Sequence, residues 1–112
     1  MKYIYIFLFV LFSSLGVSAQ ETTNELYDTT KELALEISNE LNISQDNQVY
    51  LHRALYSTAI SKDRAVKQYS NDPGMLEQTN SDIDEHFNKL LESKFNANQI
   101  SAIKDLISAK AE

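Results

Sequence analysis

Two histidines carry most of the metal or acid–base chemistry that this sequence can support. His52 lies in the middle of a long predicted helix, and His86 follows Asp82 by four residues, a spacing that puts both side chains on one helix face. If the two helices pack antiparallel, His52 can approach His86, so the candidate metal ligands are His52, Asp82 and His86. A closed zinc site usually needs four ligands. The competing interpretation is a half-buried His52 with one hydrogen-bond partner and a solvated His86.

Enzymatic chemistry has no further support in the sequence. It contains no HExxH motif, no glycine-rich phosphate loop and no nucleophile elbow. The carboxylates Asp82, Asp84 and Glu85 follow Ser81, and negative charge is favoured in the first turn of a helix. We therefore expect a protein that is not an enzyme and has no cofactor.

Composition narrows the class of partner. The chain has 16 acidic and 10 basic residues, a formal net charge of −6 at pH 7, which argues against a nucleic-acid partner. It has no cysteine, which excludes disulfides, thiolate metal sites and a lipid-modified cysteine. Two glycines and one proline leave little to interrupt helices.

Residues 1–19 have the pattern of a cleaved signal peptide. Lys2 precedes a continuous apolar run over residues 4–12, and the small residues before Ala19 suit signal peptidase. The alternative is a transmembrane anchor, but a span needs about 20 apolar residues and this run is shorter. We predict one helical domain over residues 20–112, exported to the periplasm or secreted, with no stable membrane span after cleavage.

Apolar spacing and helix breakers predict an all-α fold of about four helices, at approximately 24–41, 44–70, 73–94 and 96–110. Asp72 and Pro73 favour a third helix that begins at Pro73 rather than at Ser81. In the second helix the apolar arc covers roughly half the circumference, which is more than one partner helix needs. That helix is predicted to be central, in either a small bundle or an open hairpin-like cradle.

The opposite side of this central helix is the candidate surface for a protein client or partner. Tyr50, Arg53 and Ala54 fall there, and an exposed aromatic side chain is typical of a contact surface. The main basic cluster of the chain belongs to the same helix: Arg53, Lys62, Arg64 and Lys67.

Two of the predicted helices begin with similar cap motifs, Ile43-Ser44-Gln45-Asp46-Asn47 and Phe95-Asn96-Ala97-Asn98-Gln99. In the second motif Gln99 can return a hydrogen bond to the backbone of the Asn96 cap, and Phe95 can pack on Ile100. Ile43, Ser44 and Asn47 hold the apolar, cap and third-position places in the first motif.

These motifs resemble the LTxxQ signature of the Spy/CpxP-type family, with Asn96 in place of threonine and Asn47 in place of glutamine. The leader and the abundance of Asn, Lys, Ile and Ser also resemble small exported proteins of Bacteroidetes-type bacteria. The resemblance implies a periplasmic, stress-linked helical hairpin that commonly forms homodimers. Such proteins act as chaperones, as adaptors of a sensor kinase, or as metal-responsive regulators. The chaperone members present a basic concave surface, so an acidic chain would have different clients or partners.

The predicted function is therefore that of an exported, non-enzymatic helical binding protein, as an envelope-stress chaperone or sensor adaptor. The alternatives are a metal-responsive module that uses His52 and His86, and an exported protein with a lineage-specific role.

Overall fold

The structure, a computed structural model, describes the backbone of residues 19–111 and the side chains of residues 24–110. Over that part the chain forms α2 (Ala19–Leu41), α3 (Gln45–Gln68), α4 (Pro73–Glu92) and α5 (Ala97–Ala111), without strands. The predicted all-α fold of four helices is confirmed. The predicted signal peptide lies outside the described residues except for Ala19. None of the helices in residues 19–111 combines the length and apolar character needed to cross a bilayer.

The first described helix is longer than the sequence pattern indicated. α2 begins at Ala19 rather than near Asn24, because residues 19–24 contain no proline or glycine and each added residue gains a helical hydrogen bond. It ends at Leu41, as predicted. Asn42 then turns the chain with a φ of 55°, a left-handed conformation that asparagine adopts more readily than most residues.

The start of α4 follows the earlier of its two possible sites. The Met75 N–H donates to the Asp72 carboxylate at 3.1 Å, and Pro73 occupies the first helical position. Proline is suited to that position because its missing N–H would have no partner inside the helix. The predicted start at Pro73 is therefore confirmed.

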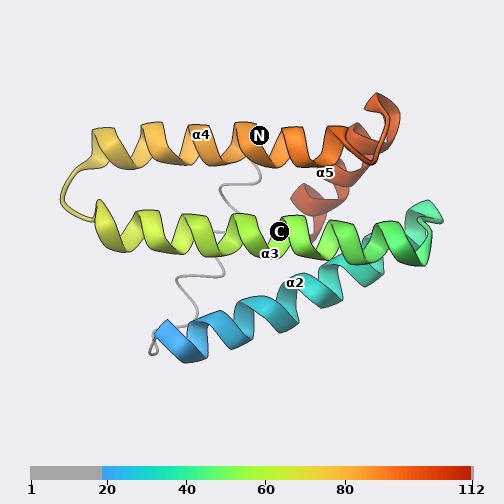
Figure 1. Ribbon diagram of the computed structural model, residues 1–112, viewed down its shortest axis with the longest axis horizontal. Helices are drawn as coiled ribbons and strands as arrows, with labels where there is room; N and C mark the ends of the chain where they lie inside the picture. Colours follow the sequence, from blue (N-terminus) through green and yellow to red (C-terminus); the bar gives the residue numbers. More distant parts are fainter. Residues whose placement is uncertain (1–18, 112) are drawn as a thin grey trace.

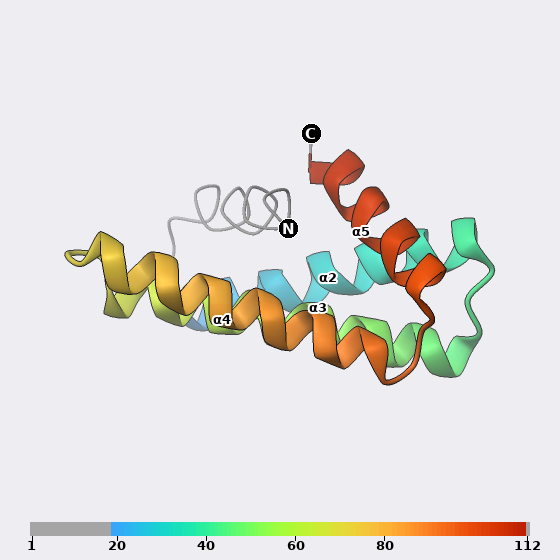
Figure 2. The same cartoon turned by 90° about the horizontal axis from the view of Figure 1, so that it is seen from above.

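α3 is the central helix of a layer formed by α2, α3 and α4 (Figure 1). It packs against α2 on one side and α4 on the other, as its wide apolar arc predicts. α5 crosses behind this layer, near the connection between α2 and α3 (Figure 2), and contacts both α2 and α4. The arrangement is a small helical bundle.

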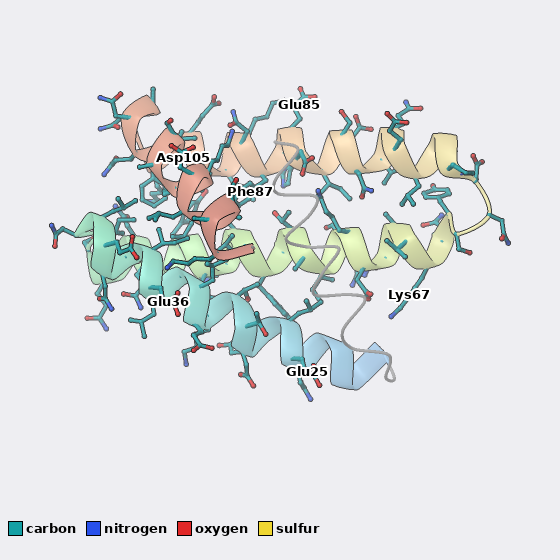
Figure 3. The ribbon with its side chains drawn as sticks, turned by 180° about the vertical axis from the view of Figure 1, so that it is seen from behind. Glu25, Glu36, Lys67, Glu85, Phe87 and Asp105 are labelled. Atoms are coloured by element: carbon teal, nitrogen blue, oxygen red, sulfur yellow. The ribbon has the colours of Figure 1, made fainter. Side chains whose placement is uncertain are left out.

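The hydrophobic core lies at the end of the bundle that α5 covers. Its buried side chains are Leu26, Leu33, Ala34, Ile37, Leu51, Ala54, Leu55, Ala59, Phe87, Leu91, Phe95, Ile100, Ile103 and Ile107. Within the described residues this cluster has no member between Ala59 and Phe87. In the rear view (Figure 3), the labelled Phe87 lies on the part of α4 that α5 approaches. The turn that joins α3 to α4 therefore lies far from the main core.

Both predicted cap motifs make cap hydrogen bonds. At the start of α5 the Gln99 N–H donates to Asn96 Oδ1 (2.8 Å), and the Asn96 N–H donates to Gln99 Oε1 (3.0 Å). These two bonds are a complete capping box. At the start of α3 the Asn47 N–H donates to Ser44 Oγ (3.3 Å), one bond of such a box.

The apolar residues that precede the two caps also behave as predicted. Phe95 is buried with Ile100 in the core cluster, and Ile43 packs against that cluster while partly exposed. Each cap therefore joins a helix start to the core by an apolar contact as well as by hydrogen bonds.

Lys62 and Asp84 form an ion pair between α3 and α4. Their Nζ and Oδ1 atoms are 2.6 Å apart, and the two side chains are only 2% and 6% exposed. Lys62 is therefore buried, unlike Arg53, Arg64 and Lys67 of the same basic cluster, which are exposed. Burial lowers the pKa of the Lys62 ammonium, whereas the hydrogen bond and charge of Asp84 act in the opposite direction. Because a buried charge needs an opposite charge beside it, the pair links α3 and α4 at one register.

The capping box at α5 gives a first testable prediction. Asn96→Ala should lower the free energy of unfolding by about 1 kcal/mol, because the Gln99 N–H loses its side-chain acceptor. Urea unfolding followed by circular dichroism measures this change. Asn98→Ala, an exposed residue of the same helical turn, is the control and should cost less than about 0.5 kcal/mol. Equal stability of the Asn96→Ala variant and the wild type would contradict the cap.

The ion pair gives a second prediction. Asp84→Ala should lower the free energy of unfolding by about 3 kcal/mol or more, because it removes the carboxylate beside a buried ammonium. The double variant Lys62→Met, Asp84→Leu should recover most of that loss, since apolar side chains replace both charges. Asp82→Ala, on the exposed side of α4, is the matched control. If Asp84→Ala lowers the free energy of unfolding no more than Asp82→Ala does, the ion pair does not stabilise the structure.

Candidate functional site

The structure separates the residues that the sequence offered as metal ligands. His52 lies on the side of α3 that faces α2, where its ring contacts Tyr27 and Tyr56. Asp82 and His86 are exposed on α4, which packs on the other side of α3. The expected approach of His52 to His86 is therefore wrong. Among the residues whose side chains are described, no three His, Cys, Asp or Glu side chains are grouped so that they could hold a metal ion.

His52 instead belongs to an aromatic cluster between α2 and α3. The Tyr27 ring meets the His52 ring edge to face, with centroids 4.7 Å apart, and the Tyr56 ring in the same manner at 5.3 Å. His52 Nε2 donates to the Tyr27 carbonyl oxygen at 3.1 Å. That oxygen can only accept, so the neutral ring carries its proton on Nε2 and leaves Nδ1 as the site of protonation.

The surroundings of His52 favour its neutral form. Partial burial lowers the pKa of the imidazole below its ordinary value of 6.5, and the positive charge of Lys31 acts in the same direction. The hydrogen bond to the Tyr27 carbonyl raises the pKa but has the smaller effect. Protonation of His52 therefore costs the folded protein stability.

The surface predicted at Tyr50 and Ala54 is absent. Ala54 is 3% exposed and belongs to the core. The Tyr50 hydroxyl donates to the Leu90 carbonyl oxygen at 2.7 Å, lies 2.6 Å from Ser93 Oγ, and is thereby tied to the end of α4. These two residues are part of the α3–α4 contact, and only Arg53 of the predicted trio remains exposed.

The physical reason is the size of the side chains on the α4 side of α3. That side carries the buried residues Ala54, Thr58, Lys62 and Ala65. Except for Lys62, these side chains are small, and small side chains let two helices approach closely. They add little hydrophobicity, however, so a pattern based on large apolar residues does not reveal this side of the helix. The sequence pattern therefore assigned this contact face to solvent.

The exposed side of α3 carries a stripe of three apolar and three basic residues, which we name the α3 outer face. Its members are Val49, Arg53, Tyr56, Ile60, Arg64 and Lys67. Steps of three and four residues keep all six within about 80° of the helix circumference. Val49 is 46% exposed, whereas Tyr56 and Ile60 are half-buried beside α2. The stripe is about 27 Å long at 1.5 Å per residue.

The basic residues of the α3 outer face differ in their partners. Lys67 donates to the Asp63 carboxylate at 2.9 Å. Arg53 and Arg64 are the only arginines in the chain, and neither forms a hydrogen bond or ion pair within the described part of the structure. A guanidinium is always charged and offers a planar fork of donors that matches a carboxylate. This face can therefore bind acidic groups next to apolar ones.

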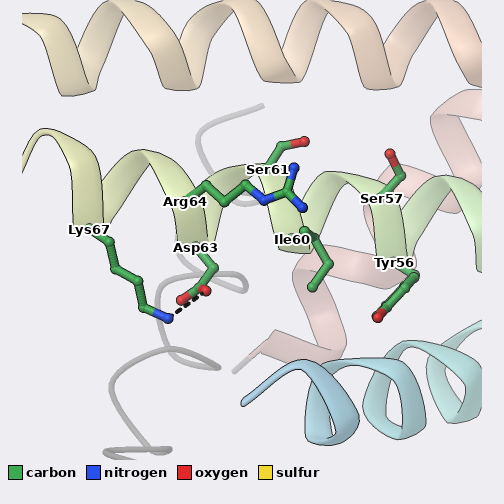
Figure 4. A pocket seen from close by; sticks show the side chains of 7 residues that line it. All are labelled: Tyr56, Ser57, Ile60, Ser61, Asp63, Arg64 and Lys67. Atoms are coloured by element: carbon green, nitrogen blue, oxygen red, sulfur yellow. Dashed lines mark hydrogen bonds and ion pairs between the residues drawn. The ribbon is translucent and has the colours of Figure 1, made fainter. Parts of the chain in front are cut away.

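A hollow of about 630 Å³ lies on the C-terminal half of the α3 outer face, which we call its distal half (Figure 4). Its described lining comes entirely from α3: Tyr56, Ser57, Ile60, Ser61, Asp63, Arg64 and Lys67. Beside it α2 diverges from α3 towards its own start (Figure 1), while Tyr56 at one end of the hollow contacts Tyr27 of α2. The hollow therefore joins exposed cationic groups to a partly apolar floor.

No protein-family model, curated protein or solved structure matches this chain. The assignment of a candidate site therefore rests on the geometry and chemistry of the α3 outer face.

The sequence contained a signal for this face that hydropathy alone did not reveal. Hydropathy places Val49, Tyr56 and Ile60 at the edge of the apolar arc of α3, where it predicts that a neighbouring helix covers them. The two arginines are eleven residues apart, a separation of just over three helical turns that places them on the same side of the helix. Their alignment with that shoulder would have identified the exposed stripe.

The state of His52 gives a testable pH dependence. Because its pKa is lower in the folded protein, the unfolded chain binds the proton first as the pH falls. The free energy of unfolding should be fully maintained above about pH 6.5 and should decrease as the pH falls from there towards the folded pKa. His52→Gln should remove this component from a series of urea titrations between about pH 7 and 5.

His86→Gln is the matched control, because it removes the other histidine and leaves the Tyr27 contact intact. The decrease in stability should persist in this variant. An identical pH profile for His52→Gln and the wild type would show that the aromatic cluster does not penalise protonation of His52.

Proposed function

We propose that this chain is a non-enzymatic, exported helical binding protein that contacts a protein partner through the α3 outer face. The observation that carries the proposal is the stripe on the solvent side of α3 that combines the apolar side chains of Val49, Tyr56 and Ile60 with three basic side chains. Apolar side chains gathered on the surface of a small protein are typical of an interaction site. Their position on one rigid helix gives the surface a fixed spacing.

The chemistry of the stripe indicates the chemistry of the partner. Arg53 and Arg64 lack acidic partners within the described residues, in a chain whose formal net charge is −6. Complementary charge steers association and disfavours wrong partners. A segment that presents acidic and apolar residues at helical spacing fits this surface, in the mode by which amphipathic helices bind along a groove.

The cap motifs support a role of the Spy/CpxP type. The Asn96–Gln99 box and the Ser44–Asn47 bond lie at the starts of α5 and α3, where the resemblance implies that such motifs occur. Together with the leader pattern, they support a periplasmic protein that acts as an envelope-stress chaperone or as an adaptor of a sensor kinase, and that forms homodimers. The acidic composition argues for clients or partners that differ from those of basic chaperones.

A light-scattering assay tests the proposed surface. The purified protein, mixed with an aggregating client at equal concentration, should suppress the rise in scattering. Val49→Glu should weaken that suppression several-fold, because it places a charge in the apolar part of the stripe and removes contact area. Circular dichroism should show unchanged helix content, since Val49 is exposed.

Leu35→Glu is the matched control. Leu35 is also 46% exposed but lies on α2, outside the stripe, so this variant carries the same change of charge on an equally exposed apolar residue. It should suppress aggregation as the wild type does. Equal activity of the Val49→Glu variant and the wild type would contradict the α3 outer face as the partner surface.

A further inference from the structure

The hollow on the α3 outer face has two chemically different ends. Tyr56 and Ile60 provide aromatic and aliphatic surface at one end, and Arg64 and Lys67 provide positive charge at the other. Eleven residues separate Tyr56 from Lys67, which is about 16 Å along the helix axis. In the view of Figure 4 the Arg64 side chain extends along α3 towards Ile60. A ligand that fills the hollow therefore meets apolar surface and a guanidinium within a short distance.

The hollow measures about 630 Å³ and is open to solvent, so a small ligand would lie in it partly exposed. Two other hollows in the described residues lack this combination. The hollow of about 480 Å³ on α4 is lined by Pro73, Leu76, Glu77, Asn80 and Ser81 and has no basic residue. The hollow between α2 and α5 measures about 140 Å³, and its Lys110 is already paired with Glu36 and Glu40.

The two cations of the distal hollow are unequal. The Lys67 ammonium already pairs with the Asp63 carboxylate, so Lys67 contributes positive charge but has fewer hydrogen-bond donors available for a ligand. Arg64 is exposed and has no acidic partner among the described residues. Its guanidinium can donate two parallel hydrogen bonds to one carboxylate, and such charge-assisted pairs are about twice as strong as neutral ones. The carboxylate of Asp63 sets a limit, since it disfavours ligands with several negative charges.

We propose that this hollow binds a free amphiphile with one apolar chain and one carboxylate, of the long-chain fatty-acid class. The carboxylate pairs with Arg64, and the chain lies over Ile60 and Tyr56. The inference rests on the proposed function in one respect, namely that the α3 outer face is a binding surface. It adds a small-molecule ligand that would compete with a protein partner for the distal half of that face.

A free amphiphile fits better than the surface of a membrane. Docking on anionic lipid needs a cluster of several basic residues on a chain that the bilayer does not repel. This chain has a formal net charge of −6, and the hollow offers two cations, one of them paired. The site is suited to one headgroup rather than to a charged surface.

Isothermal titration calorimetry with monomeric dodecanoate tests the proposal on the purified protein. One molecule should bind per chain. Dodecanol, which has the same chain without charge, should bind at least about tenfold more weakly, because the charge-assisted bonds to Arg64 are absent. Arg64→Gln should weaken dodecanoate binding by about tenfold for the same reason.

Arg53→Gln is the matched control, because it removes the other arginine of the same helix face outside the hollow. It should leave dodecanoate affinity within about twofold of the wild type. Ile60→Asn should weaken dodecanoate and dodecanol alike, since it replaces the apolar floor. Circular dichroism of each variant shows whether its fold is intact.

Several results would overturn the proposal. These are equal affinity for dodecanoate and dodecanol, unchanged affinity in Arg64→Gln, or a stoichiometry of many molecules per chain. Binding to phosphatidylglycerol vesicles without binding to monomeric dodecanoate would replace the proposed ligand with a membrane surface. Suppression of aggregation that depends on Val49, without dodecanoate binding, would refute the ligand and leave the partner surface intact. The reverse pattern would refute the partner surface alone.

Discussion

The close contact between α3 and α4 is the constraint on which the rest of this structure depends. Ala54, Thr58 and Ala65 bring the two helices together, and the buried Lys62–Asp84 pair sets one register between them. α4 covers that side of α3 and α2 covers the adjacent side, so within the described residues one side of α3 remains exposed to solvent. The position of the α3 outer face therefore follows from small and polar residues that make no part of it.

The number of helices and their order were predictable because their limits depend on local chemistry. Asn42, Asp72 with Pro73, and the Asn96 box act on backbone groups within a few residues, so the signals survive whatever the tertiary fold. The central position of α3 was also predictable, because the width of its apolar arc indicates how many neighbouring helices are needed to cover it. The start of α2 was not predictable, because a helix can extend through the polar residues 20–25 without any side-chain signal at its end.

The candidate site was predicted less well, for a physical reason that Tyr50 and Lys62 share. Each side chain is amphipathic, with an apolar body and a polar tip whose partner lies on another helix. Sequence patterning assigns such residues to solvent, because their partners, the Leu90 carbonyl and the Asp84 carboxylate, are 40 and 22 positions away in the chain. Arg53 has no such partner in the described residues, so its predicted exposure is the part that is confirmed.

The distribution of charge links the fold to the proposed binding surface. An acidic chain would be expected to neutralise its few cations internally, and Lys62, Lys67 and Lys110 do pair with carboxylates. Within the described residues the two arginines have no carboxylate partner, which is also true of Lys31, Lys94 and Lys104, although arginine is the residue best suited to a fixed carboxylate partner. Both are displayed on one helix face, interleaved with apolar residues. This is the arrangement that the proposed recognition of an external group, both acidic and apolar, would use.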